Sequence, residues 1–221
     1  METIKYPLSG HFSYKKWINL FWLVFVFILL SSCEKVPVFN FIGQKEYSSE
    51  DFVVGPPLAL DQIKRVGSVY GTPGAGEGGT SHNGIDIGAD EDTPFIAGVP
   101  GIIVAIVEGH DYYTRNKHVE LEYNSEFSVV YLFEPDKKIA VSLGQSLEKG
   151  EIIGYLGVRE AGYINQCVHF GVKRNGEWVC PVPYLEESVR KKLNEVYMSR
   201  HPPSDEPQNI CNCPEHQHYF P

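Results

Sequence analysis

The sequence predicts an all-β fold, an antiparallel β-sandwich or open barrel of short strands, followed by a C-terminal helix. Between residues 95 and 182 there are repeated short runs rich in β-branched and aromatic residues, each bounded by Gly, Pro, Asn or Asp. Such spacing is typical of antiparallel sandwiches. The dipeptide Asn175-Gly176 is a strong hairpin signal. With 43% apolar residues, the 221-residue chain has enough apolar side chains to build a core.

The expected strands are 95–99, 101–109, 117–124, 127–133, 138–143, 151–157 and 167–182. The hairpin turn pairs Arg174 with Glu177 and Val172 with Val179. In that register Cys167 lies about 13 Å along the strand from the partner of Cys180. A disulfide tolerates about 7 Å between Cα atoms, so we expect no Cys167–Cys180 bond.

Five segments are expected along the chain. They are a lipoprotein signal peptide at 1–32, a tether at 33–60, a β-rich domain at 61–185, an amphipathic helix at 186–200 and a polar tail at 201–221. The tail carries Cys211, Cys213, His216 and His218, which could bind metal or pair as thiols. Because no fold element supports that geometry in the sequence, we interpret the tail as a loose terminus.

The N-terminus has the features of an export signal. Lysines precede an apolar run at 17–30, which is shorter than the roughly 20 residues of a spanning helix. The tetrapeptide "LSSC", ending at Cys33, resembles the bacterial lipobox, in which the cysteine becomes lipidated after cleavage. A plain membrane anchor and an uncut signal are the alternatives. We therefore expect an exported lipoprotein, periplasmic or at the cell surface, attached to the membrane only through the lipid on Cys33. The remaining cysteines would then stand in a compartment that permits disulfides.

The net charge of −9 argues against nucleic acid and anionic lipid surfaces as binding partners. Nucleic acid and anionic lipid surfaces both require a basic face. We expect neither as a ligand.

A metal site is suggested by two separated stretches. In "SHNGIDIG", His82, Gly84 and Asp86 share one face of an extended chain, and Gly84 leaves room between the imidazole and the carboxylate. In "CVHFGV", His169 adds a third ligand on a strand. Three N/O ligands are the number found in catalytic zinc sites that keep one position open.

From about Arg65 to Leu185 the chain resembles the lysostaphin-type (LytM-like) zinc endopeptidases, metallopeptidase family 23. The similarity lies in three ordered stretches, "HNGIDIGADEDTPFIAGVPGIIVAI", "VSLGQSLEKGEIIGYLG" and "VHFGVKRNGEWVCPVPYL". The resemblance implies a β fold of duplicated strand units and cleavage of peptides in bacterial cell walls. It also implies Zn²⁺ held by His82, Asp86 and His169.

Two positions depart from the family pattern. Its last metal motif is His-x-His, whose first histidine is a catalytic base, and here Cys167 takes that place. Its "Y-x-H-L" motif contains a second catalytic histidine, and here "YLFE" puts Phe133 there. Tyr131 is a possible supporting hydrogen-bond donor. Removing a positioned base typically costs about 10²–10⁴-fold in rate.

Few residues near these positions carry a group that could replace the lost imidazoles. Glu134 follows Phe133 and should face the other way on a strand, whereas His110 and His118 read as structural or surface histidines. Cys167 has three open interpretations: a fourth metal ligand that closes the site, a reactive thiol, or a small buried residue that fills the space.

We therefore expect a peptidoglycan peptidase-like lipoprotein with its zinc site retained and its activity weak or lost. The alternative is an inactive module that binds wall peptide or regulates a wall hydrolase. A lipoyl or biotinyl carrier is disfavoured because the sequence has no lysine on a tight turn between the strand pairs.

Overall fold

The computed structural model describes residues 47–76, 79–107, 117–133, 139–157, 167–201, 209–213, 216 and 219. The chain divides into two units, Met1–Lys45 and Glu46–Pro221, and the described residues all belong to the second. The predicted signal peptide, Cys33, His110, Glu134 and His218 lie outside them. None of the described helices is long and apolar enough to span a membrane.

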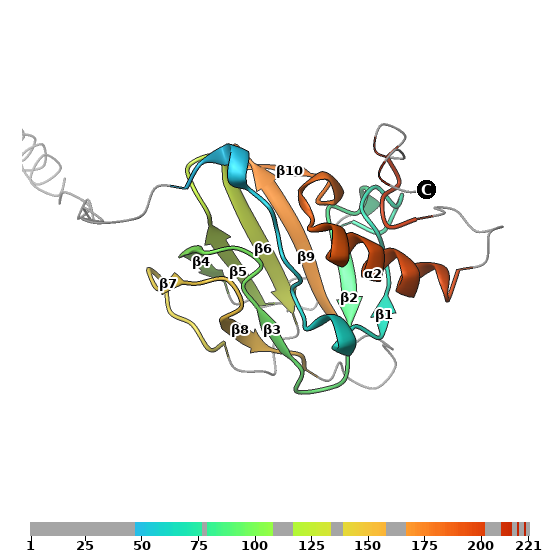
Figure 1. Ribbon diagram of the computed structural model, residues 1–221, viewed down its shortest axis with the longest axis horizontal. Helices are drawn as coiled ribbons and strands as arrows, with labels where there is room; N and C mark the ends of the chain where they lie inside the picture. Colours follow the sequence, from blue (N-terminus) through green and yellow to red (C-terminus); the bar gives the residue numbers. More distant parts are fainter. Residues whose placement is uncertain are drawn as a thin grey trace, which may run out of the picture. The chain divides into compact units, whose positions relative to one another are not determined.

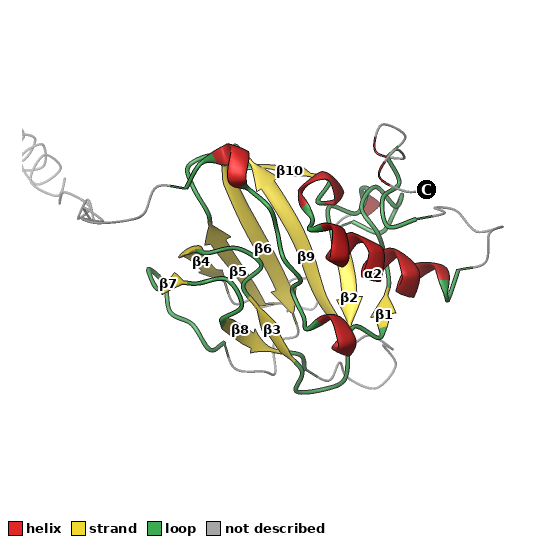
Figure 2. Cartoon of the chain, in the orientation of Figure 1, coloured by secondary structure: helices red, strands yellow, loops and turns green. Residues whose placement is uncertain are grey.

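The second unit is built on one large antiparallel sheet (Figures 1 and 2). Its strands run in the order β1-β2-β9-β6-β5-β4-β7, and β10 pairs with β9 beyond the end of β2. The bounds are β1 Arg65–Val66, β2 Ile85–Gly88, β4 Gly101–Val107, β5 Lys117–Glu122, β6 Phe127–Phe133, β7 Ser146–Leu147, β9 Cys167–Arg174 and β10 Glu177–Val179. A separate pair joins β3 (Pro94–Ile96) to β8 (Ile152–Tyr155). The all-β prediction is confirmed.

The β9–β10 hairpin has the predicted register. Arg174 stands opposite Glu177 and Val172 opposite Val179. Asn175 and Gly176 adopt positive φ angles of 52° and 81°, as a two-residue turn between twisted antiparallel strands requires. The hairpin therefore sets which side chains of β9 face each side of the sheet.

In the part of the chain that the structure describes, three short 3₁₀ helices and one α-helix accompany the strands. They are η1 (Ser49–Asp51), η2 (Leu60–Gln62), η4 (Val182–Tyr184) and α2 (Glu187–Met198). Helix α2 lies within the predicted range 186–200 and crosses the end of the sheet near β1 and β2 (Figure 1). Its Val189 and Leu193 are fully buried. Burying a leucine of this kind contributes about 1.5–3 kcal/mol to folding.

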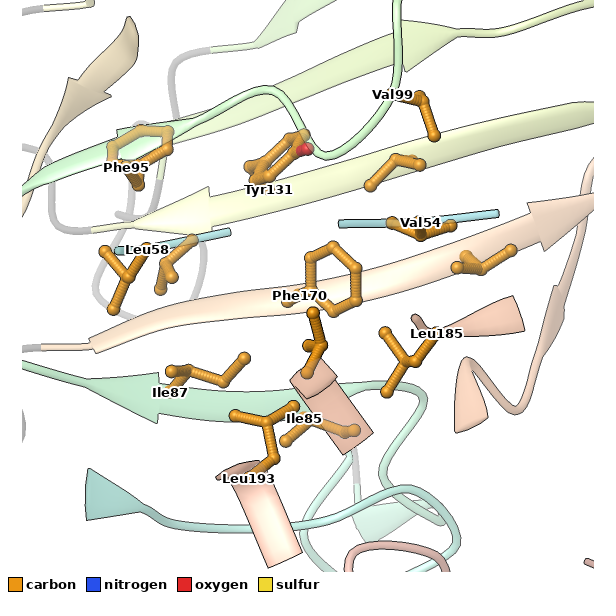
Figure 3. Close-up of a cluster of buried hydrophobic side chains, with 14 of the residues drawn as sticks. Val54, Leu58, Ile85, Ile87, Phe95, Val99, Tyr131, Phe170, Leu185 and Leu193 are labelled. Carbon is orange, nitrogen blue, oxygen red and sulfur yellow. The ribbon is translucent and has the colours of Figure 1, made fainter. Parts of the chain in front are cut away.

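The core occupies one face of the large sheet (Figure 3). The side chains of Ile85, Ile87, Tyr131 and Phe170 gather there with Leu193 of α2. Side chains alternate faces along a strand, so the residues between them, among them Asp86 and His169, point to the opposite face. The sheet thus has one apolar face and one face that carries the predicted ligands.

Two predicted boundaries are wrong. The tether was expected to extend to residue 60, but Phe52, Val54 and Leu58 are buried in the core. Phe52 stacks on Phe127 with ring centroids 4.2 Å apart, and the backbone N–H of Val54 donates to the carbonyl of Tyr184. Apolar side chains spaced along a proline-containing stretch gave no period to read, which is why sequence alone missed them.

The tail is also not a loose terminus where it is described. Ile210 and Cys211 are fully buried, and Cys211 forms a parallel bridge with Tyr70. The expected strand at 138–143 is reduced to one bridge, Ile139 to Gly154. A turn closed by Gln145 against Ser142 interrupts further pairing there.

Candidate metal centre

Asp86 and His169 face each other directly across the β2–β9 pair. Cross-strand neighbours in an antiparallel pair have Cα atoms about 4.5–5.5 Å apart, close enough for their side chains to meet. The Nδ1 of His169 lies 3.0 Å from Oδ1 of Asp86. Two ligands therefore come from the most regular part of the sheet.

His82 reaches the same point from the loop that precedes β2. Its backbone is held on both sides, since its N–H donates to the carbonyl of Thr72 and its own carbonyl accepts from the N–H of Gly71. Its Nδ1 lies 3.2 Å from the carbonyl oxygen of Val69, which can only accept, so Nδ1 carries the proton. The Nε2 lone pair then points at the other two ligands, 3.0 Å from Nδ1 of His169 and 3.3 Å from Oδ1 of Asp86.

Gly84 makes this convergence possible. A Cβ at that position would lie 2.6 Å from Nε2 of His169 and 2.5 Å from the carbonyl oxygen of Phe170. Both distances are shorter than real Cβ contacts, so any side chain would displace His169. The role expected for this glycine agrees with its surroundings.

The three groups polarise one another. Burial acts to raise the pKa of Asp86, but hydrogen bonds and charge from His169 and His82 outweigh it and hold the pKa at about 2. Burial opposes protonation of His82, yet the hydrogen bond and charge of Asp86 raise the pKa of His82 above its ordinary value. Asp86 is therefore an anion at neutral pH, aimed at two imidazoles.

Phe133 does not lie beside this cluster, contrary to the expectation for a residue in a catalytic position. It is buried in the core and packs on Phe95, with ring centroids 4.6 Å apart. Leu132 is the residue of β6 that stands opposite His169 and shares its face. Tyr131 also points into the core, where its hydroxyl accepts a hydrogen bond from the N–H of Gly98 at 2.8 Å. The pairing of β6 with β9 thus places Leu132, and not Phe133, on the face of His169.

Cys167 lies on the same face as His169, opposite Gly88, and is partly exposed. Its sulfur is not part of the three-residue cluster found among the described residues. The described geometry therefore gives the cluster three ligands rather than four.

Residues that the sequence did not single out complete this face. Trp178 lies over Gly171, and its ring centroid is 6.2 Å from that of His169. Counting register from the hairpin would have found it, because Trp178 is paired with Lys173, which shares the face of His169.

On the same face, Glu120 of β5 links side chains of the neighbouring strands β6 and β9. It accepts hydrogen bonds from Lys173 at 2.7 Å and Ser128 at 2.6 Å, and Nε2 of His118 lies 3.6 Å away. The nearby imidazole of His118 is the largest influence on the Glu120 carboxyl, and together with Lys173 and Ser128 it outweighs burial and lowers the pKa to about 2. His118 is thus part of a charged network on the sheet.

Part of the chain matches a known protein family. Residues 80–181 match the family described as Peptidase family M23. Among curated proteins, none matches the chain.

Several solved structures are similar to the chain. Lysostaphin from Staphylococcus simulans is 24% identical with a TM-score of 0.48, over 59% of this chain and 52% of that one. A zinc containing peptidase from Vibrio cholerae is 24% identical with a TM-score of 0.45, over 56% of this chain and 37% of that one. A putative peptidase M23 from Pseudomonas aeruginosa is 20% identical with a TM-score of 0.48, over 63% and 53%. The chain thus spans between about a third and a half of the length of these relatives.

The family match contains all three residues of the cluster, His82, Asp86 and His169. It also contains the hairpin that sets the face of His169. Residues 80–181 of this chain are therefore similar in sequence to peptidase family M23.

Proposed function

We propose that this chain is an exported, lipid-anchored protein of the bacterial cell wall that binds zinc through His82, Asp86 and His169 and hydrolyses wall peptides weakly or not at all. The observation that supports this most directly is that the three ligand atoms lie close together and have, among the described residues, no further imidazole beside them that could transfer a proton. They converge on the open face of the sheet, while Leu132 and Cys167 stand beside them in place of imidazoles.

The cluster fits a zinc ion. Ligand atoms about 2.0–2.2 Å from a common centre at tetrahedral angles lie about 3.3–3.6 Å apart. The three distances here are 3.0, 3.0 and 3.3 Å. The Val69 carbonyl orients His82 in the way that outer hydrogen bonds orient metal-bound imidazoles. A zinc ion in this place would supply Lewis acidity toward a peptide carbonyl and a water molecule.

Proton transfer is the part of hydrolysis that this face lacks. Leu132, which stands opposite His169, has no titratable group. His118 stands in the same cross-strand row but two strands from His169, about 10 Å away. A general base must lie within about 3.2 Å of the proton that it takes, so His118 is too distant for that role.

The face could still bind a peptide. Trp178 and Leu132 provide apolar surface beside the ligand cluster, and Lys173 lies over the Trp178 ring at 5.2 Å. This surface favours the alternative function, in which the domain binds a wall peptide or a wall hydrolase without cleaving anything. We keep that alternative as an outcome of the test.

The test compares peptide release from crosslinked peptidoglycan by the full-length chain and by the double variant Leu132→His, Cys167→His. We expect the natural chain to release little and the double variant to gain about 10²-fold or more, as restored proton-transfer groups can give. The matched control is Phe133→His, Cys167→His, in which the first imidazole enters the core against Phe95. It should not gain activity.

Release by the natural chain at the rate of lysostaphin under the same conditions would contradict the weak-or-lost activity. Binding to peptidoglycan that persists in chelator, with no release by the double variant, would favour the binding module. Incorporation of labelled palmitate that disappears in Cys33→Ser would support the lipid anchor.

A further inference from the structure

A second group of metal-binding side chains lies away from the site described above. It comprises Cys180, Cys211, Cys213 and His216, each offering one ligand atom, and these four atoms all lie within 4.8 Å of one another. The Sγ atoms of Cys180 and Cys211 are 2.7 Å apart, and Sγ of Cys211 is 3.6 Å from Nδ1 of His216. We call this group the thiol cluster.

The thiol cluster joins segments that are far apart in the sequence. Cys180 follows β10, whereas the other three residues lie beyond α2 and outside the residues that match the family. The exposed fractions of Cys180, Cys211 and Cys213 are 4%, 0% and 9%. The backbone N–H of His216 donates to the carbonyl of Cys213, which turns its imidazole back toward the thiols.

The composition of the cluster points to a metal rather than to a disulfide. A disulfide uses two thiols and gains nothing from an imidazole, but three sulfurs and one nitrogen meet here. Three cysteines and one histidine form one of the standard ligand sets of structural zinc, which is tetrahedral and fully enclosed by protein. Thiolates select soft cations such as zinc over magnesium or calcium.

We propose that the thiol cluster binds a structural zinc ion that fastens the C-terminal segment to the end of β10 and so holds it against the loop carrying His82. That segment already contacts this loop. The N–H of Asn212 donates to the carbonyl of Tyr70 at 2.8 Å, and its side-chain amide donates to the carbonyl of Gly71 at 3.2 Å.

The same loop orients His82. Gly71 donates to the His82 carbonyl, Thr72 accepts from the His82 N–H, and Val69 accepts from its ring. The C-terminal segment therefore contacts, through Asn212, the same loop whose hydrogen bonds hold His82 of the first cluster. Zinc binding by the thiol cluster does not depend on the proposed function, because the two clusters share no residue.

The experiment measures zinc per chain and thiol state in the full-length protein purified without chelator. We expect two zinc ions per chain, one for each cluster. Asp86→Ala and Cys213→Ser should each leave one. The cobalt-loaded natural chain should show a strong thiolate-to-cobalt charge-transfer band in the near ultraviolet, which Asp86→Ala keeps and Cys213→Ser weakens.

Cys167→Ser is the matched control, because it removes a thiol near the first cluster and leaves the thiol cluster intact. It should retain both the band and the stoichiometry. Loss of the band in this variant would overturn the proposal, since the thiolate would then belong to the first cluster.

Measurements on the natural chain test the proposal even if a variant fails to fold. Intact mass that is lighter by two hydrogen atoms, with the bond mapped to Cys180 and Cys211, would show a disulfide and overturn the proposal. One zinc per chain with all thiols reduced, and no thiolate band with cobalt, would overturn it as well. Loss of zinc in Asp86→Ala alone bears on the proposed function and leaves the thiol cluster unaffected.

Discussion

The two ligand clusters of this protein differ in chemistry and in the structure that supports them. The first combines two imidazoles with a carboxylate, and its Asp86 side chain keeps 23% of its surface exposed. Two of its ligands stand on paired strands of the large sheet. Three hard or intermediate ligands with an open side are suited to binding a substrate.

The thiol cluster has the opposite character. Three of its four ligands are soft thiols and the fourth is an imidazole. Its cysteines are buried, and the ligands come from the end of a strand and from the C-terminal segment. A full set of four protein ligands leaves no position for a substrate. Paired strands thus fix two ligands of the first cluster in the regular geometry of the sheet, whereas the thiol cluster joins the end of β10 to a segment far away in the sequence.

Gly84→Ala should have the largest effect, because it should remove zinc from one cluster and not from the other. The added methyl group meets His169 and the backbone of Phe170, so the first cluster should lose its zinc while the thiol cluster keeps its own. Overpacking of this kind also costs about 1–3 kcal/mol of stability. Zinc per chain, measured by elemental analysis, should fall from two to one.

Gly67→Ala is the matched control for that change. Its Cβ would meet only ordinary contacts, the nearest being Cβ of Asp86 at 3.4 Å. It should keep both ions. Full zinc content in Gly84→Ala would contradict the role of this glycine.

Acid should affect the sheet face of the first cluster through Glu120. Its carboxyl has a pKa of about 2 in the folded chain against 4.5 as the reference. A lowered pKa stabilises the fold above pH 4.5, and this contribution is lost as the pH falls from there toward 2. Glu120→Gln should therefore cost about 1–3 kcal/mol near neutral pH, and its difference from the natural chain should shrink across that window.

Urea unfolding at a series of pH values measures this difference. Glu126→Gln is the control, because Glu126 forms an exposed pair with Arg174, a kind of pair that contributes little to stability. A deficit in Glu120→Gln that stays constant from neutral pH to pH 2 would argue against the network.

Asn212→Ala should have the smallest effect and tests whether the two clusters communicate. It removes the side-chain bond to Gly71, which should cost about 0.5–1.5 kcal/mol. The first cluster should also bind zinc less tightly, by under the roughly 10-fold that a direct partner of a ligand can cost. Competition with a chromogenic chelator measures that affinity.

Gln145→Ala provides the comparison for a single lost hydrogen bond, because its side chain accepts from the N–H of Ser142 in an exposed loop. A similar stability loss with unchanged zinc affinity is expected there. Equal affinities in both variants would mean that the clusters are independent.

The strand pattern and the hairpin were predictable because they depend on local chemistry. Alternating apolar residues mark strands, and Asn175-Gly176 can adopt the positive φ angles of a tight turn. The three predicted ligands are brought together by the pairing of β2 with β9, as their positions on extended segments had indicated. The family match over residues 80–181 agrees with the resemblance seen in the motifs.

The errors have a common physical cause. Phe133 and Leu132 are adjacent, and only the pairing of β6 with β9 decides which one stands on the face of His169. A shift of one residue exchanges a core position for a site position. Motif spacing alone does not contain that register.

The sequence by itself determined the strands, the turn and the residues capable of binding metal, since propensity and side-chain chemistry are properties of short segments. Only the tertiary structure decided that Phe52, Val54 and Leu58 belong to the core and that Cys180 meets Cys211, Cys213 and His216. Those contacts join segments separated by tens of residues. Their free energy comes from burial and ligand convergence, which exist only once the chain has folded.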